Sequence, residues 1–252
     1  MITVSGLTKT YDAQTVLGPV SEHLAVGGLT SLIGPNGAGK STLLTITGRL
    51  AAPDTGQVLL DGLDVHRAKS SEVARRLAVL RQENHVTARV TVRELVGFGR
   101  FPHSGGRLRA EDVEHVDRAL EFLDLTDLQD RFLDQLSGGQ RQRAHVAMVL
   151  AQDTGHVLLD EPLNNLDIKH AVRMMGLLRR AADELGRTVV LVVHDINFAA
   201  AWSDRIVALR DGRVVASGTP AEMVTPEVLG RVFDTPVRVH VLDGVPTAVY
   251  YR

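Results

Sequence analysis

A glycine-rich stretch near the N-terminus, LIGPNGAGKST at residues 32–42, constrains the fold of this chain more than any other feature. The apolar run TSLI leads into it, and the helix-forming run STLLTITGRL overlaps its end. Between a strand and a helix, the spacing G-x-x-x-x-G-K-[ST] is typical of a loop whose backbone amides surround a polyphosphate. The chain matches that spacing from Gly34 to Ser41.

The predicted ligand of this loop is a nucleoside triphosphate. Lys40 would reach the β- and γ-phosphates, and the hydroxyl of Ser41 would bind Mg²⁺. A glycine-rich turn with a chance lysine is the alternative, and the flanking strand and helix argue against it. The residues expected to contact the nucleotide are Gly34, Pro35, Asn36, Gly37, Ala38, Gly39, Lys40, Ser41 and Thr42.

Short apolar runs rich in Val, Ile and Leu recur along the chain, among them QVLLDG, HVLLDE and TVVLVVH. Several are continuous rather than alternating, which suits strands buried on both faces of a mostly parallel sheet. Between them, residues 111–125 and 170–185 carry apolar side chains at helical spacing. Strands that alternate with helices predict an α/β fold.

Residues 85–153 interrupt this alternation, because they consist of helical patterns and loops. We therefore predict an inserted helical subdomain at 85–153 and a core formed by residues 1–84 and 154–252. The 252 residues, 44% of them hydrophobic, suffice for one substantial core with a smaller lobe. The formal net charge of −2 provides no basic field, so no nucleic-acid partner is expected.

The composition also bears on the compartment. No apolar run is long enough to span a bilayer, and the N-terminus lacks the pattern of a signal peptide. The absence of cysteine fits a reducing compartment such as the cytosol. If the protein works at a membrane, we expect it to do so through a partner.

Two later strands end in polar side chains. HVLLDEP ends in Asp160 and Glu161, and TVVLVVHD ends in His194. Strands of a parallel sheet deliver such residues to one edge, where an aspartate can hold Mg²⁺ and a glutamate can polarise an attacking water. Each feature alone is more often structural than catalytic, but the phosphate loop in the same chain favours a catalytic role.

A second glycine element, LSGGQRQR at residues 136–143, lies inside the predicted helical subdomain. It would form a helix N-terminus with bare amides, ready for an anion, at Ser137, Gly138, Gly139 and Gln140. One nucleotide cannot easily occupy two such distant sites in one chain. Two copies related by a two-fold axis can pair the glycine loop of one with the LSGGQ of the other. The alternative is an ordinary serine N-cap.

In their order and approximate spacing, the glycine loop, LSGGQ, LLDEP and His194 resemble the nucleotide-binding subunits of ABC transporters. The resemblance covers nearly the whole chain. It implies a P-loop ABC ATPase core, with a mostly parallel sheet and an antiparallel β subdomain, and an inserted helical subdomain. It also implies ATP hydrolysis with Mg²⁺ as cofactor.

The resemblance assigns roles to single residues. It implies that Tyr11 stacks on adenine, that Gln82 joins the two lobes and senses Mg²⁺, and that Asp167 lies in a loop crossing the dimer interface. The implied catalytic residues are Glu161, His194, Gln82 and Lys40, with Glu161 as general base. The implied metal ligands are Ser41, Gln82 and Asp160.

Three positions depart from the common pattern of the family. Leu163 stands where threonine is frequent, Asn164 stands where serine is usual, and Gly28 stands where an acidic residue is common. None of these departures removes a catalytic group, so the resemblance still implies activity.

Two segments resemble one branch of the family. GRFPH at 99–103 and EPLNNLDIKH at 161–170 are similar to the ATPases of iron–siderophore, haem and cobalamin importers, and PLNNLD to the siderophore branch. This implies permease subunits that dock near residues 82–103 at the cytoplasmic face of the cell membrane. It also implies, indirectly, an extracytoplasmic substrate-binding protein.

A soluble ABC ATPase that drives the assembly of a cofactor or complex stays open as an alternative. Repair and chromosome members carry long coiled coils, and this sequence has no sustained heptads. A non-catalytic binding subunit is disfavoured, because every hydrolytic residue is present. The ten histidines show no i, i+4 pair, so no dedicated metal site beyond Mg²⁺ is expected.

Overall fold

The structure, a computed structural model, describes residues 1–24, 27–82 and 88–251. Within these ranges the strands form a six-stranded sheet, a four-stranded sheet and a two-stranded hairpin. The six-stranded sheet has the order β10-β9-β3-β8-β7-β6, in which only β10 is antiparallel to its neighbour. Its strands are β3 (Leu29–Ile33), β6 (Leu77–Leu80), β7 (His156–Leu159), β8 (Thr188–Val192), β9 (Arg205–Arg210) and β10 (Arg213–Gly218).

Alternate side chains of this sheet enter two different cores. Leu158 and Val190 pack in one cluster with helix α1 (Lys40–Thr47). Val157 and Val189 pack in another with helix α7 (Ile168–Glu184). Because both faces are covered, β3, β7 and β8 are buried along their whole length, which explains their mostly apolar sequences.

The four-stranded sheet is antiparallel and has the order β2-β1-β4-β5. Its strands are β1 (Ile2–Tyr11), β2 (Gln14–Leu24), β4 (Thr55–Leu60) and β5 (Leu63–Asp64). Ile2, Leu7 and Val58 from this sheet join the cluster that contains α1, so α1 is buried between the two sheets. The predicted combination of a mostly parallel sheet and an antiparallel β subdomain is confirmed.

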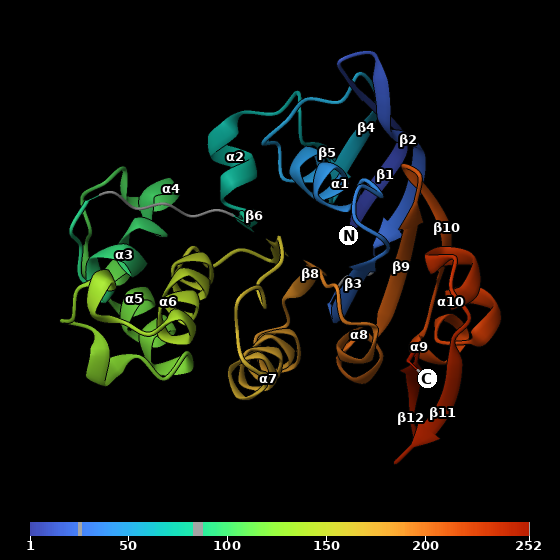
Figure 1. Cartoon of the computed structure of the whole chain (residues 1–252). Helices are drawn as coiled ribbons and strands as arrows, with labels where there is room; N and C mark the ends of the chain where they lie inside the picture. Colours follow the sequence, from blue (N-terminus) through green and yellow to red (C-terminus); the bar gives the residue numbers. More distant parts are fainter. Residues whose placement is uncertain (25–26, 83–87, 252) are drawn as a thin grey trace.

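A group of helices, coloured green in Figure 1, lies beyond the β6 edge of the central sheet. It contains α3 (Val92–Phe98), α4 (Phe101–Ser104), α5 (Ala110–Phe122) and α6 (Gly138–Ala151), with short 3₁₀ turns at Thr126–Leu128 and Leu133–Gln135. Helix α2 (Ser70–Ala74) precedes β6. The predicted boundary between residues 84 and 85 lies outside the described residues, and the predicted domain limits stay a prediction.

Close packing and one buried ion pair join these helices. A Cβ at Gly99 would lie 1.9 Å from the carbonyl oxygen of Met148, so α3 and α6 approach more closely than a side chain would allow. Arg100 Nε donates to Asp112 Oδ1 at 2.9 Å, and both side chains are buried. Arg100 Nη1 also donates to the carbonyl of Ala151 at the end of α6.

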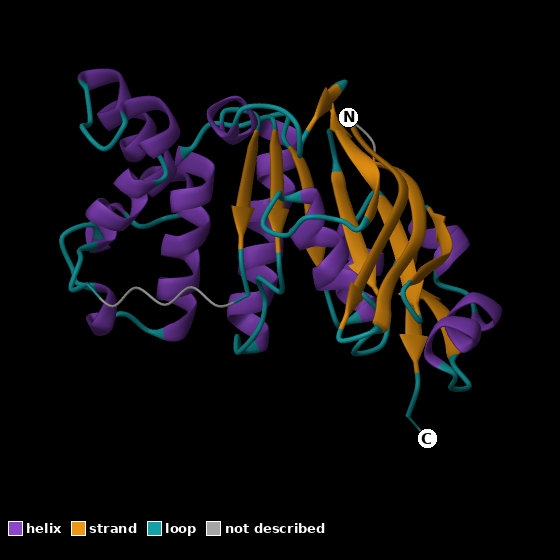
Figure 2. Ribbon diagram, turned by 90° about the horizontal axis from the view of Figure 1, so that it is seen from above, coloured by secondary structure: helices purple, strands orange, loops and turns teal. Residues whose placement is uncertain are grey.

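The C-terminal part packs on β3 and β9 of the central sheet. It comprises α8 (Ile196–Trp202), α9 (Pro220–Met223), α10 (Pro226–Phe233) and the hairpin β11 (Arg238–Leu242) and β12 (Val245–Val249). The Asn197 amide fixes the hairpin to α8 by two hydrogen bonds with the backbone of Ala248. Figure 2 shows this layering of helices and strands from above. Across the ranges that the structure describes, no helix has the length and apolar character needed to cross a bilayer.

Candidate active site

The glycine loop connects β3 to α1 and is shaped by backbone conformations that favour glycine. Gly34, Gly37 and Gly39 have φ values of 144°, 78° and 92°. A Cβ at Gly34 would lie 2.1 Å from the carbonyl oxygen of Leu209 on β9, so no other residue fits there. The loop therefore keeps its backbone close to the sheet, as in loops whose amides approach a phosphate.

Lys40 is the first residue of α1, and its side chain turns back into the loop. Its Nζ donates to the carbonyls of Gly34 at 2.8 Å and Pro35 at 2.9 Å. Burial lowers the pKa of the Lys40 ammonium, and the nearby carboxylates of Glu161 and Asp160 oppose this shift. An ammonium has three donors, so the third can be directed at a phosphate.

Ser41 and Asp160 form a second contact between the loop and the sheet. Ser41 Oγ donates to Asp160 Oδ1 at 2.9 Å, and Asp160 is buried at the end of β7. Burial raises the pKa of the Asp160 carboxyl, the Ser41 hydrogen bond opposes this, and Glu161 raises it further. A hydroxyl beside a carboxylate is the oxygen set that Mg²⁺ prefers, so these two residues fit that ion.

The described residues contain no group of three or more His, Cys, Asp or Glu side chains placed to hold a metal ion. A Mg²⁺ ion at Ser41 and Asp160 would therefore take its other ligands from water and from the phosphates of a nucleotide.

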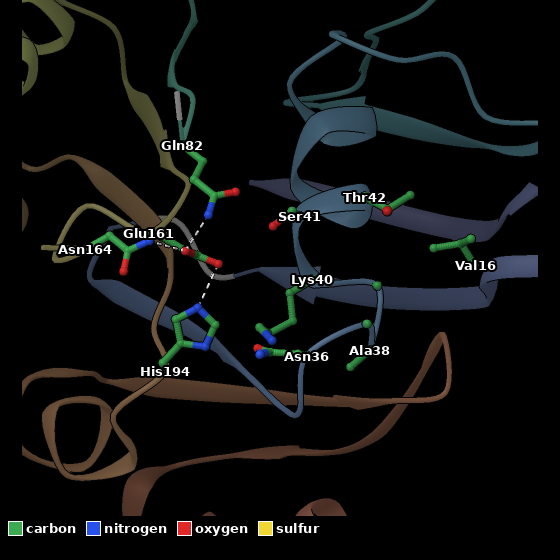
Figure 3. A pocket seen from close by; sticks show the side chains of 12 residues that line it. Val16, Asn36, Ala38, Lys40, Ser41, Thr42, Gln82, Glu161, Asn164 and His194 are labelled. Atoms are coloured by element: carbon green, nitrogen blue, oxygen red, sulfur yellow. Dashed lines mark hydrogen bonds and ion pairs between the residues drawn. The ribbon is translucent and has the colours of Figure 1, made fainter. Parts of the chain in front are cut away.

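Glu161 is surrounded by three donor side chains (Figure 3). Gln82 Nε2 and Asn164 Nδ2 donate to its Oε2 at 2.8 Å and 2.7 Å. His194 Nε2 lies 2.7 Å from its Oε1. The backbone of Glu161 has a φ of 50°, which is uncommon for a residue with a side chain and clusters at functional sites.

The topology explains why these residues meet. Gln82, Glu161 and His194 each stand two residues beyond the end of a strand, namely β6, β7 and β8. These strands are neighbours in the parallel sheet, and the glycine loop follows β3, the next strand along. Carboxyl ends of parallel strands share one edge, which brings together residues that are far apart in the sequence.

The convergence encloses an open cavity of about 560 Å³. Lys40 and Ser41 face the Glu161 group across it (Figure 3). The lining residues are Val16, Asn36, Gly37, Ala38, Gly39, Lys40, Ser41, Thr42, Gln82, Glu161, Asn164 and His194. The sequence patterns predict no site role for Val16, and they distinguish Asn164 only as a departure from a family pattern. No local signal marks Val16, which lies on β2 in the antiparallel sheet.

Other predicted site residues lie outside this cavity. Ser137 caps α6, since its Oγ accepts from the backbone of Gln140 at 3.3 Å and Gln140 Oε1 accepts from the backbone of Ser137 at 2.9 Å. Asp167 caps α7 and accepts from the backbone of His170 at 2.8 Å. Tyr11 is about half exposed beside Lys9, whose Nζ lies 5.2 Å from the ring centroid. Gly138 and Gly139 open α6, so the whole LSGGQ segment is separate from the cavity of its own chain.

A family model described as ABC transporter matches residues 17–164 of this chain. The chain belongs to the ABC transporter family. The family inferred from the four motifs is thereby confirmed. This ABC cassette is 49% identical to the petrobactin import ATP-binding protein YclP of Bacillus subtilis (strain 168), and the match covers 100% of both chains.

Two further relatives are also described as ATP-binding proteins of import or transport. The cassette is 52% identical to the petrobactin import ATP-binding protein FatE of Bacillus anthracis, over 99% of this chain and 100% of the relative. It is 43% identical to the ferric enterobactin transport ATP-binding protein FepC of Escherichia coli (strain K12), over 96% and 91% of the two chains.

Solved structures share the fold. One is the dimeric post-hydrolysis state of the ATP-binding cassette MJ0796 bound to ADP and Pi, with a TM-score of 0.78, 31% identity and coverage of 87% of this chain and 99% of that chain. Another is an inward-facing structure described as a metal-chelate type ABC transporter, with a TM-score of 0.85, 25% identity and coverage of 100% and 97%. The predicted ABC ATPase fold is confirmed, and the cassette is an ATPase of the transport type.

Proposed function

We propose that this ABC ATPase powers the import of an iron–siderophore complex of the petrobactin type. The convergence of the glycine loop, Gln82, Glu161 and His194 at one sheet edge carries the ATPase part of the proposal. The full-length similarity to the two petrobactin import proteins supports the cargo.

In the proposed hydrolysis reaction, each polar group described below has its own role. Backbone N–H groups of the loop between Gly34 and Thr42, with the exception of Pro35, which has none, bind the phosphates together with the third donor of Lys40. Glu161 accepts a proton from the attacking water, while Gln82 and His194 hold the water and the γ-phosphate side of the site. Water adds to the γ-phosphorus, the bond to the bridging oxygen breaks, and ADP leaves with that oxygen. Mg²⁺, bound by Ser41, Asp160 and Gln82, would neutralise phosphate charge.

A second copy of the chain completes the proposed site. The LSGGQ residues Ser137 to Gln140 lie outside the cavity of their own chain, yet they open a helix of the length that can bind an anion. A head-to-tail dimer would place them over the phosphates held by the other copy, with Asp167 at the interface and Tyr11 on the adenine. The dimeric structure of MJ0796 supports this arrangement by similarity.

Permease subunits would dock near residues 82–103 and hold the cassette at the cytoplasmic face of the membrane. Residues 83–87 lie outside the described part of the chain. Of the described residues in this segment, Phe98 and Phe101 expose 53% and 65% of their surface at the ends of α3 and α4. Aromatic side chains exposed in this way are typical of a protein interface. An extracytoplasmic binding protein would deliver the cargo to the permease.

An affinity purification from detergent-solubilised membranes tests the proposal. We expect the tagged chain to recover a many-helix permease, and the reconstituted complex to hydrolyse ATP faster with a binding protein loaded with ferric petrobactin than with haem or cobalamin. Recovery of cytosolic partners alone would contradict import and favour the assembly ATPase. The variant Phe101→Glu should reduce permease recovery, and Leu185→Glu, at an exposed site beyond α7, is the control.

A further inference from the structure

Residues 161–167 form a tight, anchored turn between β7 and α7. The backbone N–H of Asn164 donates to the Glu161 carbonyl at 3.1 Å, and that of Leu166 donates to the Leu163 carbonyl at 3.2 Å. Leu163 and Leu166 pack against the hydrophobic cluster under α7. This packing explains why residue 163 is apolar: the Leu163 side chain anchors the turn to the core.

The anchored turn directs the side chain of Asn164 back at Glu161. Asn164 Nδ2 donates to Glu161 Oε2 at 2.7 Å, and the amide lines the cavity (Figure 3). Gln82 Nε2 donates to the same oxygen, so two amides from different loops hold Oε2. Among the described contacts, His194 is the one neighbour of Oε1.

We propose that Asn164 is a positioning residue that fixes the Glu161 carboxylate for proton transfer. The proposal rests on the proposed role of Glu161 as general base. With Oε2 held by two amide donors, rotation of the carboxylate about its terminal bond would break both hydrogen bonds, so Oε1 stays on the side of His194. A base held in one orientation raises the rate of the chemical step without strengthening substrate binding.

The chemistry of the contact limits which side chain can do this. The position needs an N–H donor that reaches about as far as an asparagine amide. Leucine has nearly the same size but no donor. Aspartate has the same shape but places a second carboxylate against Glu161, which repels it. The serine common in the family has a shorter side chain, so an equivalent direct contact would need a different turn.

Steady-state ATPase kinetics of the full-length chain test the proposal. We expect Asn164→Leu to lower kcat roughly tenfold, the loss typical of one hydrogen bond to a charged group, with little change in the KM for ATP. Asn164→Asp should lower kcat further. Gln57→Glu is the control, because it adds one negative charge at an exposed residue of β4 outside the cavity. Unchanged kcat in Asn164→Leu would overturn the proposal.

A double-mutant cycle separates positioning from general damage to the loop. In a Glu161→Gln background, Asn164→Leu should cause little further loss of the residual single-turnover rate, because it acts through the carboxylate that is already gone. An equal loss in both backgrounds would show a structural effect and overturn the proposal. Fast turnover by Glu161→Gln itself would instead contradict the general-base assignment, so the two failures are distinguishable.

Discussion

The imidazole of His170 packs directly against the backbone of Gly139, so that a Cβ at Gly139 would lie 2.4 Å from His170 Cδ2. His170 Nδ1 lies 2.7 Å from the Asp167 carboxylate, which caps α7. The first turn of α6, which carries LSGGQ, is thus in contact with the first turn of α7 in the same chain.

This contact predicts the behaviour of Gly139→Ala. The added methyl would displace the His170 ring and lower the free energy of unfolding by about 1–3 kcal/mol, the usual cost of overpacking. Thermal unfolding measures the loss. Gly138→Ala is the matched control, since a Cβ there has no neighbour within 4 Å. The double variant Gly139→Ala, His170→Ala should recover most of the stability, and a failure to recover would contradict the steric explanation.

Glu161→Gln should separate nucleotide binding from hydrolysis. The amide keeps the size of the side chain but cannot accept the proton of the attacking water. We expect the hydrolysis rate to fall by roughly 10²–10⁴-fold, with ATP affinity retained and a nucleotide-bound dimer accumulating. Single-turnover assays and size-exclusion chromatography with ATP measure these effects. Turnover within a few-fold of the parent chain would exclude Glu161 as the base.

Lys40→Ala should abolish ATP binding or hydrolysis. The ammonium is held by the carbonyls of Gly34 and Pro35, so it is already placed beside the loop where the phosphates would bind. Its removal leaves phosphate charge uncompensated in a partly buried site. Equilibrium binding of a fluorescent ATP analogue measures the loss. Lys69→Ala, at an exposed residue before α2, is the control and should bind normally.

The buried pair of Arg100 and Asp112 predicts a pH dependence of stability. The backbone N–H of Arg109 and then the Arg100 guanidinium lower the pKa of the Asp112 carboxyl below its ordinary value. A pKa lowered by folding stabilises the folded chain fully above the ordinary aspartate pKa, and this contribution is lost as the pH falls through the lowered value. Asp112→Asn should therefore be less stable at neutral pH.

The pH profile provides the check on that prediction. The difference in unfolding free energy between Asp112→Asn and the parent chain should shrink as the pH falls below about 4. Chemical denaturation at several pH values measures it. Asp130→Asn, at an exposed aspartate, should show little difference at any pH. A difference that stays constant with pH would mean that the charge of Asp112 does not contribute.

Much of the site could be predicted from local sequence. The glycine loop, Asp160, Glu161 and His194 follow apolar runs of strand length, and parallel strands bring their carboxyl ends to one edge whatever the sequence between them. Gln82 has no such local mark. Its role followed only from the family resemblance, yet it stands two residues beyond β6 and bonds to Glu161.

At the three positions that depart from the family pattern, the structural role depends on neighbouring parts of the fold and cannot be predicted from the residue type. Gly28 has a φ of 80°, and a Cβ there would lie 2.6 Å from Asp204 Oδ2, the oxygen that accepts from the Leu29 backbone. An acidic group is therefore present at this position in space, although it comes from another part of the chain. Leu163 and Asn164 likewise acquire their functions from the turn that they form.

The order of strands and helices, the phosphate loop and the helix caps can be read from the amino-acid pattern, because each depends on neighbours within a few residues. The contacts of Gln82, Asn164 and His194 with one carboxylate, and of His170 with Gly139, come instead from the folded arrangement of the chain. Those contacts depend on the relative positions of loops from separate strands. The direction of the Asn164 side chain is set further by the left-handed backbone at Glu161 and Asn165, in a turn that is packed against its core.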